Sequence, residues 1–506
     1  MKKIFYLFIF SLLTVLVSCE KEAVTPQNVI EGRNMTITNE AISTDYVGNG
    51  AQWGGYDIVP SWLGNATLSE SDWNTLFKRI DFMRPPFLRI MISAGWAYLE
   101  ADGSYNETSD KTTSLIKMLE YAQSKNIEIT LGEWGHLTKS SDIADVDPTW
   151  VENSVKFLNY LVSTKGFTCI KTANIINEPN GEWSSTKGSY DVWLKVQKLY
   201  VEEMAKYPAL ASIGLMGPDV AIWDSTREAK WIMDAAKDMD THIGLYDVHV
   251  YPKQQIVRNG DYTKMLQGYR DATPEGKKIV LGEVGFKYTE VDAELKTLNE
   301  QLIEADPFAG DDSNMMIYEA FYGIDMADAI IQSMIAGFSG ALAWDMDDAM
   351  YNQDGSSQNK ELKRWGFWNI LGEELCANPD DENIRPWFYP TSLLCRYFPA
   401  GSTINKIELP NKKGVRAVMA EKDGKYTIAI VNSHYVTYEI NLQSTAYNNM
   451  TLNKYTYKPS KGKEFVGNVD SEGFATPEEN SIALDLLNGY NFNLEGESFV
   501  LFTNMD

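Results

Sequence analysis

The sequence predicts an α/β fold, a (β/α)8 TIM barrel followed by a C-terminal antiparallel β-sandwich domain. From about residue 45 to 398, short apolar runs alternate with helical periodicity, which is typical of βαβ units and a parallel sheet. After about residue 400 the pattern changes to short strands with period-2 alternation. Neither GxGxxG nor GxxxxGKS/T occurs, which disfavours an open nucleotide-binding sheet.

Eight short apolar runs are the candidate barrel strands. Continuous apolar runs of this length, separated by helical stretches, are typical of buried parallel strands. The first lies near Val47–Ile58, where glycines obscure its limits. The other seven are Phe87–Ser93, Ile127–Trp134, Thr172–Asn177, Ile213–Gly217, Leu245–Val250, Lys278–Gly282 and Gly340–Trp344.

Apolar stripes at helical spacing lie between these runs and are predicted to pack on the outside of the barrel. The clearest stripes are Trp73–Ile80 after Ser69 as N-cap, Val151–Val162 ended by Gly166, and Ala320–Met334.

The C-terminal strands include Val415–Met419, Tyr426–Val431 and Val436–Leu442, and Asn34–Thr38 is a candidate strand for the same sheet. The predicted organisation is a signal peptide over 1–18, a tether with this possible strand over 19–44, the barrel over 45–398 and the β-sandwich over 399–506.

The N-terminus predicts export. Two lysines precede an apolar run over residues 4–17, shorter than the ~20 residues that span a bilayer, as in a secretory signal. The run ends in Leu16-Val17-Ser18-Cys19, which resembles the lipobox of bacterial lipoproteins. That resemblance implies lipid attachment at Cys19 and a place in the bacterial cell envelope, in the outer membrane on its surface or periplasmic face. An ordinary cleaved signal is the alternative.

Charge and composition limit the classes of molecule that the protein is expected to bind. The formal net charge is −25, so nucleic acid and anionic lipid are disfavoured and a neutral substrate fits better. With four histidines and no CxxC pair, the sequence predicts no metal centre and no cofactor. Cys169 is predicted to be in the core, whereas Cys376 and Cys395 could form a disulfide. We expect a monomer.

Two glutamates stand at predicted strand ends. Glu178 follows the fourth run in Asn177-Glu178-Pro179-Asn180, and Glu283 follows the seventh in Gly282-Glu283-Val284-Gly285. The carboxyl ends of the strands carry the chemistry of (β/α)8 barrels. Either glutamate alone could be a solvated or salt-bridged carboxylate, but the pair on one face is stronger evidence for an active site.

These residues make the sequence similar to glycoside hydrolase clan A, which places its acid/base and nucleophile at these two strand ends. The resemblance covers the whole barrel and includes Arg89 on the second strand, His249-Val250-Tyr251 after the sixth and Trp344 at the eighth. The segment from Phe388 to Ser402 resembles the join between barrel and β-sandwich in families 30 and 39. Families 5, 30 and 39 or a newer relative remain open.

The resemblance implies a retaining β-glycoside hydrolase that cleaves a β-linked polysaccharide or oligosaccharide, with β-glucan or β-mannan favoured. Glu178 would be the acid/base and Glu283 the nucleophile, with carboxyl groups roughly 5–5.5 Å apart. Two acids this close have pKa values that are driven apart.

The resemblance also assigns supporting roles. Asn177 would bind the sugar 2-hydroxyl, and Trp344 would form the floor of the sugar-binding site. Arg89 and Tyr251 would hold the nucleophile. His249 would line the side of the site that carries the acid/base. A purely structural role is the alternative for Arg89 and Tyr251.

Other side chains are open to two interpretations. Glu133, next to Trp134 and His136, is a rival carboxylate that could instead bind substrate or His136. Asp345, Asp347 and Asp348 are predicted to form a solvated loop, with calcium binding as an alternative. Aromatic residues near the strand ends suggest a carbohydrate cleft: Trp96, Trp134, Trp183, Trp223, Tyr251, Phe286 and Trp344.

Two further functions fit the same residues. One is a transglycosylase, and the other is a catalytically inactive, carbohydrate-binding surface lipoprotein. The presence of both glutamates favours an enzyme. The insertion Tyr288–Asn314 is predicted to close one end of the cleft.

Overall fold

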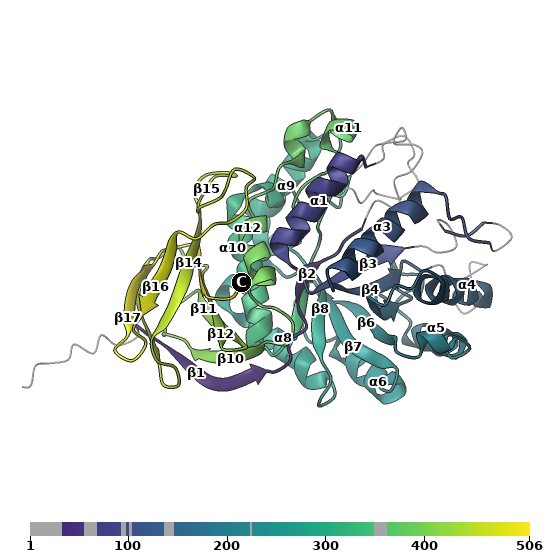
Figure 1. Ribbon diagram of the computed structural model, residues 1–506, viewed down its shortest axis with the longest axis horizontal. Helices are drawn as coiled ribbons and strands as arrows, with labels where there is room; N and C mark the ends of the chain where they lie inside the picture. Colours follow the sequence, from purple (N-terminus) through teal and green to yellow (C-terminus); the bar gives the residue numbers. More distant parts are fainter. Residues whose placement is uncertain are drawn as a thin grey trace, which may run out of the picture.

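The computed structural model describes residues 33–54, 68–92, 98–100, 104–135, 146–222, 225–348 and 362–506 (Figure 1). Among these, eight parallel strands form one sheet in the order β2-β9-β8-β7-β6-β5-β4-β3. The Trp53 amide donates to the Arg89 carbonyl at 2.7 Å and links β2 to β3, so the sheet closes on itself. The predicted (β/α)8 barrel is confirmed.

The barrel strands are β2 (Gly48–Ala51), β3 (Phe87–Ile92), β4 (Glu128–Glu133), β5 (Ile170–Asn174), β6 (Gly214–Ile222), β7 (Ile243–Val250), β8 (Ile279–Val284) and β9 (Gly340–Ala343). Each coincides with a predicted run, with ends shifted by a few residues. Two shifts matter for function, because β5 stops before Asn177 whereas β8 runs past Glu283.

The helices cover the outside of the barrel. The predicted N-cap is confirmed, since the Ser69 hydroxyl and the Asp72 carboxylate form a capping box at the start of α1. The main helices are α1 (Glu70–Met83), α3 (Asp110–Ser124), α4 (Pro148–Asn159), which continues as a π-helix (Tyr160–Thr164), α5 (Tyr190–Met204), α6 (Ala229–Met239), α8 (Asp261–Ala272) and α10 (Ala320–Ile335). Further helices are α9 (Ala293–Ala305) and the shorter α7 (Gln254–Asn259), α11 (Gly372–Cys376) and α12 (Phe388–Arg396). Within the described ranges, no helix has the length and apolar character that a membrane span requires.

A second, ten-stranded sheet is built from one strand that precedes the barrel and from the described strands that follow it. Its strands are β1 (Asn34–Ser43), β10 (Thr403–Glu408), β11 (Val415–Lys422), β12 (Lys425–Asn432), β13 (Tyr438–Ser444), β14 (Met450–Pro459), β15 (Phe465–Val466), β16 (Glu479–Leu484), β17 (Tyr490–Leu494) and β18 (Ser498–Thr503). The candidate N-terminal strand is part of it, since β1 lies between β10 and β13. The sheet is antiparallel, as predicted, except that β1 and β13 run parallel.

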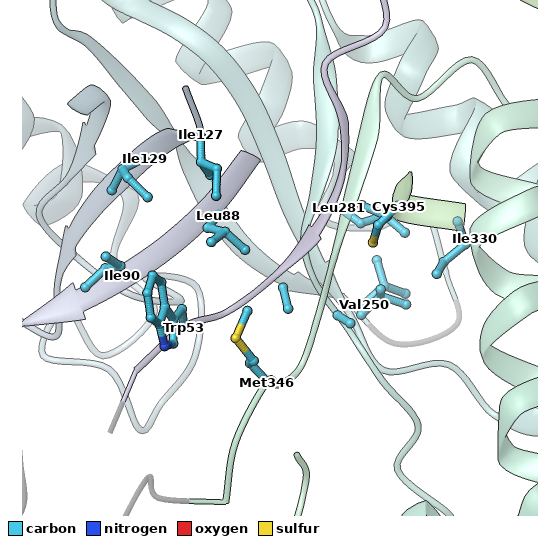
Figure 2. Close-up of a cluster of buried hydrophobic side chains, with 14 of the residues drawn as sticks. Trp53, Leu88, Ile90, Ile127, Ile129, Val250, Leu281, Ile330, Met346 and Cys395 are labelled. Carbon is cyan, nitrogen blue, oxygen red and sulfur yellow. The ribbon is translucent and has the colours of Figure 1, made fainter. Parts of the chain in front are cut away.

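The sheet has two buried faces. Met419 and Ile428 face its own core, whereas their neighbours Val418 and Ala429 belong to the core shared with the barrel. Helix α10 lies between the barrel and this sheet and is buried almost all round (Figure 1). Figure 2 shows side chains of the barrel strands and of α10 and α12, among them Leu281, Ile330 and Cys395, in one apolar cluster.

The structure corrects the prediction for the aspartates after the eighth strand. Asp345, Asp347 and Asp348 are buried rather than solvated. Asp347 accepts hydrogen bonds from the Trp368 indole at 2.8 Å and the Ile370 amide at 3.1 Å. Asp348 accepts from the guanidinium groups of two arginines that come later in the chain. The distant arginines explain why the burial was not visible locally.

The cysteines in the described part of the chain are not paired. Cys169, Cys376 and Cys395 are all free and buried, so the possible disulfide between Cys376 and Cys395 does not exist in this structure. Burial raises the pKa of Cys376 to about 11, which keeps the thiol protonated and unreactive. Cys169 is in the core, as predicted.

Replacement of Arg385 should destabilise the fold. Its guanidinium donates to Asp348 at 2.8 Å and to Asp381 at 3.1 Å, and all three side chains are buried. We expect Arg385→Met to lower the free energy of unfolding by about 3–5 kcal/mol, because it leaves buried carboxylates short of a partner. Denaturant unfolding measures this. Lys425→Met, which removes an exposed ion pair with Asp506, is the control and should change stability by less than about 1 kcal/mol. Equal losses in the two variants would contradict the prediction.

Candidate active site

The interior of the barrel changes from apolar to charged towards the carboxyl ends of the strands. An apolar layer fills the amino-terminal end and consists of Phe87, Met216, Leu245, Val280 and Leu342, with Val47 beside it. The next layer is built from buried charged side chains: Arg89, Asp219, Asp247, His249 and Glu283. Burying so many charges is unfavourable unless they pair with one another, so their hydrogen bonds define the site.

A β-bulge turns Glu283 into the barrel. Leu281 packs in the outer core, so strict alternation along β8 would send Glu283 to the helices as well. However, Val248 pairs with Leu281 and the next residue, His249, pairs with Glu283, so Gly282 is an extra residue. Such a bulge reverses the direction of the side chains that follow it. Glu283 therefore faces the interior.

Two donors hold the Glu283 carboxylate. Arg89 donates through Nη1 to Oε1 at 2.6 Å, and the Tyr251 hydroxyl donates to Oε2 at 2.5 Å. Burial raises the pKa of Glu283 above its usual value, while His249 and Arg89 oppose that rise. The carboxylate is thus buried, oriented and supplied with positive charge.

Glu178 lies in the loop after β5, with a backbone φ of 46°, which is left-handed and unfavourable for a side chain with a Cβ. Its amide N–H donates to Asp219 Oδ2 at 3.2 Å, which helps to hold that conformation. The carboxyl group has two different neighbours, because Oε1 lies 3.2 Å from His249 Nδ1 and Oε2 accepts from the Trp183 indole at 2.8 Å.

The two glutamates lie side by side. A carboxylate oxygen of Glu178, one of Glu283 and a ring nitrogen of His249 all lie within 4.8 Å of one another. His249 Nδ1 is also 3.4 Å from Glu283 Oε1. The imidazole therefore contacts both carboxyl groups at once.

Arg89 connects several strand ends. Its Nη2 donates to Asn177 Oδ1 at 2.8 Å, and its Nη1 donates to Gln52 Oε1 at 3.1 Å in addition to Glu283. These partners come from residues that follow the first and fourth barrel strands and from the seventh strand itself. A single guanidinium thus fixes the positions of Asn177 and Glu283 relative to each other.

A buried aspartate pair lies beneath these groups and was not predicted from sequence. Asp219 accepts from His249 Nε2 at 2.9 Å and from Arg89 Nη2 at 3.3 Å. Asp247 accepts the Asp219 amide N–H at 3.0 Å, while its Oδ2 has no hydrogen-bond partner. A Cβ at Gly282 would lie only 2.5 Å from that oxygen, so the bulge needs glycine.

The pair has opposite protonation tendencies. Burial and the neighbouring Asp219 raise the pKa of Asp247 to about 7. Burial acts in the same direction on Asp219, but His249 and Arg89 outweigh it and hold the pKa of Asp219 well below its usual value. For His249, burial would lower the pKa, yet the carboxylates of Asp219 and Glu283 raise it well above its usual value. The surrounding carboxylates therefore favour the cationic form of the imidazole.

The same carboxylates and His249 could in principle reach a metal ion, in the group Glu178, His249 and Glu283 or in the group Asp219, Asp247 and His249. The Arg89 guanidinium already lies 2.6 Å from Glu283 and 3.3 Å from Asp219. A second cation at this distance would be repelled, and the arginine supplies the charge that a metal would. The residues do not fit a metal centre.

Aromatic rings border the nucleophile. Trp344, Tyr251 and Trp365 are buried in one cluster with Trp134 packed against it. Trp134 and Trp344 meet edge to face at a centroid distance of 6.4 Å, and Tyr251 and Trp365 at 5.6 Å. Trp365 was missed because it comes 21 residues after Trp344, beyond any predicted strand end.

The remaining residues singled out in the sequence have different outcomes. Phe286 is fully buried against Tyr322 and belongs to the core rather than to a cleft. Trp183 is exposed beside Glu178. Trp96, Trp223, His136 and Cys19 lie outside the described residues.

Glu133 faces away from the other two glutamates. The pairing of β3 with β4 is continuous up to Ile92 and Glu133, with no bulge, so Glu133 points to the same side as Leu131, towards the helices. Consistent with this, burial and then the Glu133 charge raise the pKa of Tyr200 on α5.

The insertion Tyr288–Asn314 forms a 3-10 turn (Glu290–Asp292) and α9, and borders the aromatic cluster. The Asp312 carbonyl accepts from the Trp365 indole at 2.5 Å. A cavity of about 190 Å³ lies between this segment and Trp365. The insertion therefore forms a wall of the active site on the side of the nucleophile Glu283.

Comparison with solved structures identifies the fold. A glycoside hydrolase family 30 endoxylanase from Clostridium papyrosolvens C71 has a TM-score of 0.59 and 13% identity, and the alignment covers 94% of this chain and 100% of that one. A family 51 α-L-arabinofuranosidase from Bifidobacterium longum has a TM-score of 0.64 and 11% identity, covering 93% and 99%. A family 39 β-xylosidase from Caulobacter crescentus has a TM-score of 0.57 and 11% identity, covering 94% and 100%.

These similarities show a shared fold. The chain has the barrel and C-terminal β domain found in clan A glycoside hydrolases, so the resemblance noted in the sequence is confirmed at the level of the fold. Families 30 and 39 were among those suggested by the sequence, and family 51 was not. No protein-family model matches the sequence, and a search of curated proteins found no relative.

Proposed function

We propose that the protein is a retaining glycoside hydrolase that cleaves a β-linked polysaccharide or oligosaccharide by double displacement. The observation that carries the proposal is the approach of Glu178 and Glu283 to within 4.8 Å, oxygen to oxygen. Retaining enzymes hold the two carboxyl groups about 5–5.5 Å apart, whereas inverting enzymes need about 6.5–9.5 Å to admit a water molecule.

In the first step, Glu178 as a carboxylic acid gives its proton to the glycosidic oxygen. Glu283 as a carboxylate attacks the anomeric carbon, the bond from that carbon to the glycosidic oxygen breaks, and the leaving group departs as an alcohol. Arg89 and Tyr251 orient the attacking carboxylate through their bonds to Oε1 and Oε2.

In the second step, Glu178 as a carboxylate takes a proton from water. The water oxygen attacks the anomeric carbon and Glu283 leaves as a carboxylate, which restores both groups. His249 contacts both carboxyl groups and, as a cation, stabilises whichever of them is ionised. Asn177, positioned by Arg89, would bind the sugar 2-hydroxyl, and Trp344 would floor the ring.

The first experiment is hydrolysis of a panel of polysaccharides, oligosaccharides and aryl glycosides, with the anomeric configuration of the first product read by proton NMR. The panel includes β-glucan and β-mannan, which we favour, and also xylan and arabinofuranosides, on which the structural neighbours act by name. Release of a product with retained configuration supports the proposal. Inversion rejects double displacement, and binding without cleavage would support a catalytically inactive carbohydrate-binding protein.

We also propose attachment to the cell envelope through lipid at Cys19. The support is the short apolar run that ends at this cysteine. Metabolic labelling with a fatty acid, lost in Cys19→Ser, tests the proposal, and unchanged labelling of that variant contradicts it.

The pH dependence of activity should reflect burial of the nucleophile. Burial raises the pKa of Glu283, and the carboxylate must be ionised to attack, so activity is lost as the pH falls through that raised pKa. The acid limb of kcat/KM should therefore lie above the ordinary glutamate value of about 4.3. Tyr251→Phe removes a donor that lowers this pKa and should move the acid limb to higher pH.

The measurement is kcat/KM against pH for both proteins with one aryl glycoside. Tyr438→Phe, in the β-sandwich, serves as the control and should leave the profile unchanged. An acid limb that does not move in Tyr251→Phe contradicts the assigned contact.

A further inference from the structure

We propose that Trp183 forms a subsite for the leaving group, an aromatic platform that binds a sugar ring on the far side of the cleaved bond and also positions the acid Glu178. The inference rests on the proposed glycosidase function. It names the substrate class, because a saccharide with a further sugar beyond the cleaved bond would be preferred over a glycoside of a small alcohol.

The side of the site on which Trp183 lies follows from the contacts of Glu178. Oε1 of that carboxyl group faces His249 inside the barrel, whereas Oε2 accepts from the Trp183 indole at 2.8 Å. A general acid contacts the leaving-group oxygen in the reaction. The side chain attached to the outer oxygen of the acid therefore borders the leaving group and not the sugar bound to Glu283.

The indole is pre-positioned by the glycine beneath it. A Cβ at Gly181 would lie 2.3–2.6 Å from three ring atoms of Trp183, so the ring lies flat against the Gly181 backbone. Turn hydrogen bonds fix that backbone, with the Gly181 amide donating to the Glu178 carbonyl at 3.0 Å and the Ser184 amide donating to the Gly181 carbonyl at 3.1 Å. A ring held this way loses little conformational entropy when a ligand binds.

Exposure separates Trp183 from the other rings of the site. Trp183 is 58% exposed, whereas Trp344, Tyr251 and Trp365 on the nucleophile side are 6%, 6% and 2% exposed. An exposed, rigidly held aromatic face beside a general acid is suited to the C–H face of a pyranose. The protein carries a net charge of −25, so an uncharged sugar fits better than an acidic one.

The test separates the platform from the hydrogen bond. Gly181→Ala keeps every reacting group but displaces the indole, and Trp183→Ala removes it. Gly181 does not have a positive φ, so alanine is compatible with its backbone. Trp183→Phe keeps an aromatic face but loses the N–H donor to Glu178. Tyr435→Ala is the control, because Tyr435 is 79% exposed in the β-sandwich, on the loop between β12 and β13.

The readout is kcat/KM for two substrates with the same sugar on the nucleophile side, a dinitrophenyl glycoside and an oligosaccharide that the panel shows to be cleaved. In Gly181→Ala and Trp183→Ala we expect kcat/KM to fall about 3–10-fold more for the oligosaccharide than for the aryl glycoside. In Trp183→Phe we expect KM for the oligosaccharide to be kept and kcat to fall, because the acid is less well positioned.

Equal losses on both substrates, or no loss on the oligosaccharide, would overturn the inference while leaving the two-glutamate mechanism standing. Absence of any cleavage by the unmodified protein would reject the proposed function, and this subsite with it. The two failures are therefore distinguishable.

Discussion

Glu283→Gln is expected to lower kcat on every substrate by about 10⁴–10⁶-fold, because it removes the carboxylate that attacks the anomeric carbon. Glu178→Ala should behave differently. It should lower kcat by about 10²–10⁴-fold for substrates with poor leaving groups, but spare formation of the glycosyl-enzyme from a dinitrophenyl glycoside, which needs no proton. A burst of dinitrophenol followed by slow turnover is the expected time course.

Chemical rescue with azide provides a second test of this first prediction. It attacks the anomeric carbon of the glycosyl-enzyme without a general base, so it should restore turnover of Glu178→Ala and give a glycosyl azide, but should not rescue Glu283→Gln in this way. Glu182→Gln, at an exposed position in the same loop, is the control and should be fully active. Full activity of Glu283→Gln, together with loss of activity in Glu133→Gln, would show that the nucleophile has been misassigned.

Arg89→Met should damage both stability and catalysis. The fully buried guanidinium bonds to Glu283, Asp219 and Asn177, and its loss leaves two buried carboxylates with less compensation. We expect a loss of about 3–5 kcal/mol in the free energy of unfolding. Removing the positive charge also raises the pKa of Glu283 further, so kcat/KM near neutral pH should fall about 100- to 1,000-fold, with the acid limb moved to higher pH.

Arg416→Met is the matched control for this second prediction. Arg416 is also buried and pairs with Asp328 at 3.0 Å, but at the junction of the barrel with the second sheet. It should lose comparable stability and keep the pH profile of the parent. Denaturant unfolding and kcat/KM against pH distinguish the two variants. An unchanged acid limb in Arg89→Met would contradict the role given to this arginine.

The barrel could be predicted because each parallel strand is a short apolar run, and that signal is local. The positions of Glu178 and Glu283 at strand ends follow from the same runs. The direction of Glu283 does not, since alternation from Leu281 would send it outward and only the bulge at Gly282 turns it in. Glu133 and Glu283 have similar neighbours in the sequence but point in opposite directions, which the sequence alone did not predict.

Most of the buried aspartates beneath and beside the two glutamates could not be predicted from short sequence patterns. Asp219 lies within β6 with a φ of 61°. The residues around it in the sequence do not predict this left-handed conformation. Asp247 could have been found, because it stands two residues before His249 on the same face of β7. Asp348 seemed exposed because its partners Arg364 and Arg385 come much later in the chain.

The position of β1 in the second sheet has a consequence for how the chain is assembled. Thr36 of β1 pairs with Glu408 and with Gln443, so the entire barrel is inserted between the first strand of the second sheet and the remainder of that sheet. During synthesis β1 leaves the ribosome before the barrel, and its partners β10 and β13 follow only after the barrel, which can fold in the interval. The second sheet is thus a discontinuous domain, and its completion joins segments from before and after the barrel into one cooperative unit.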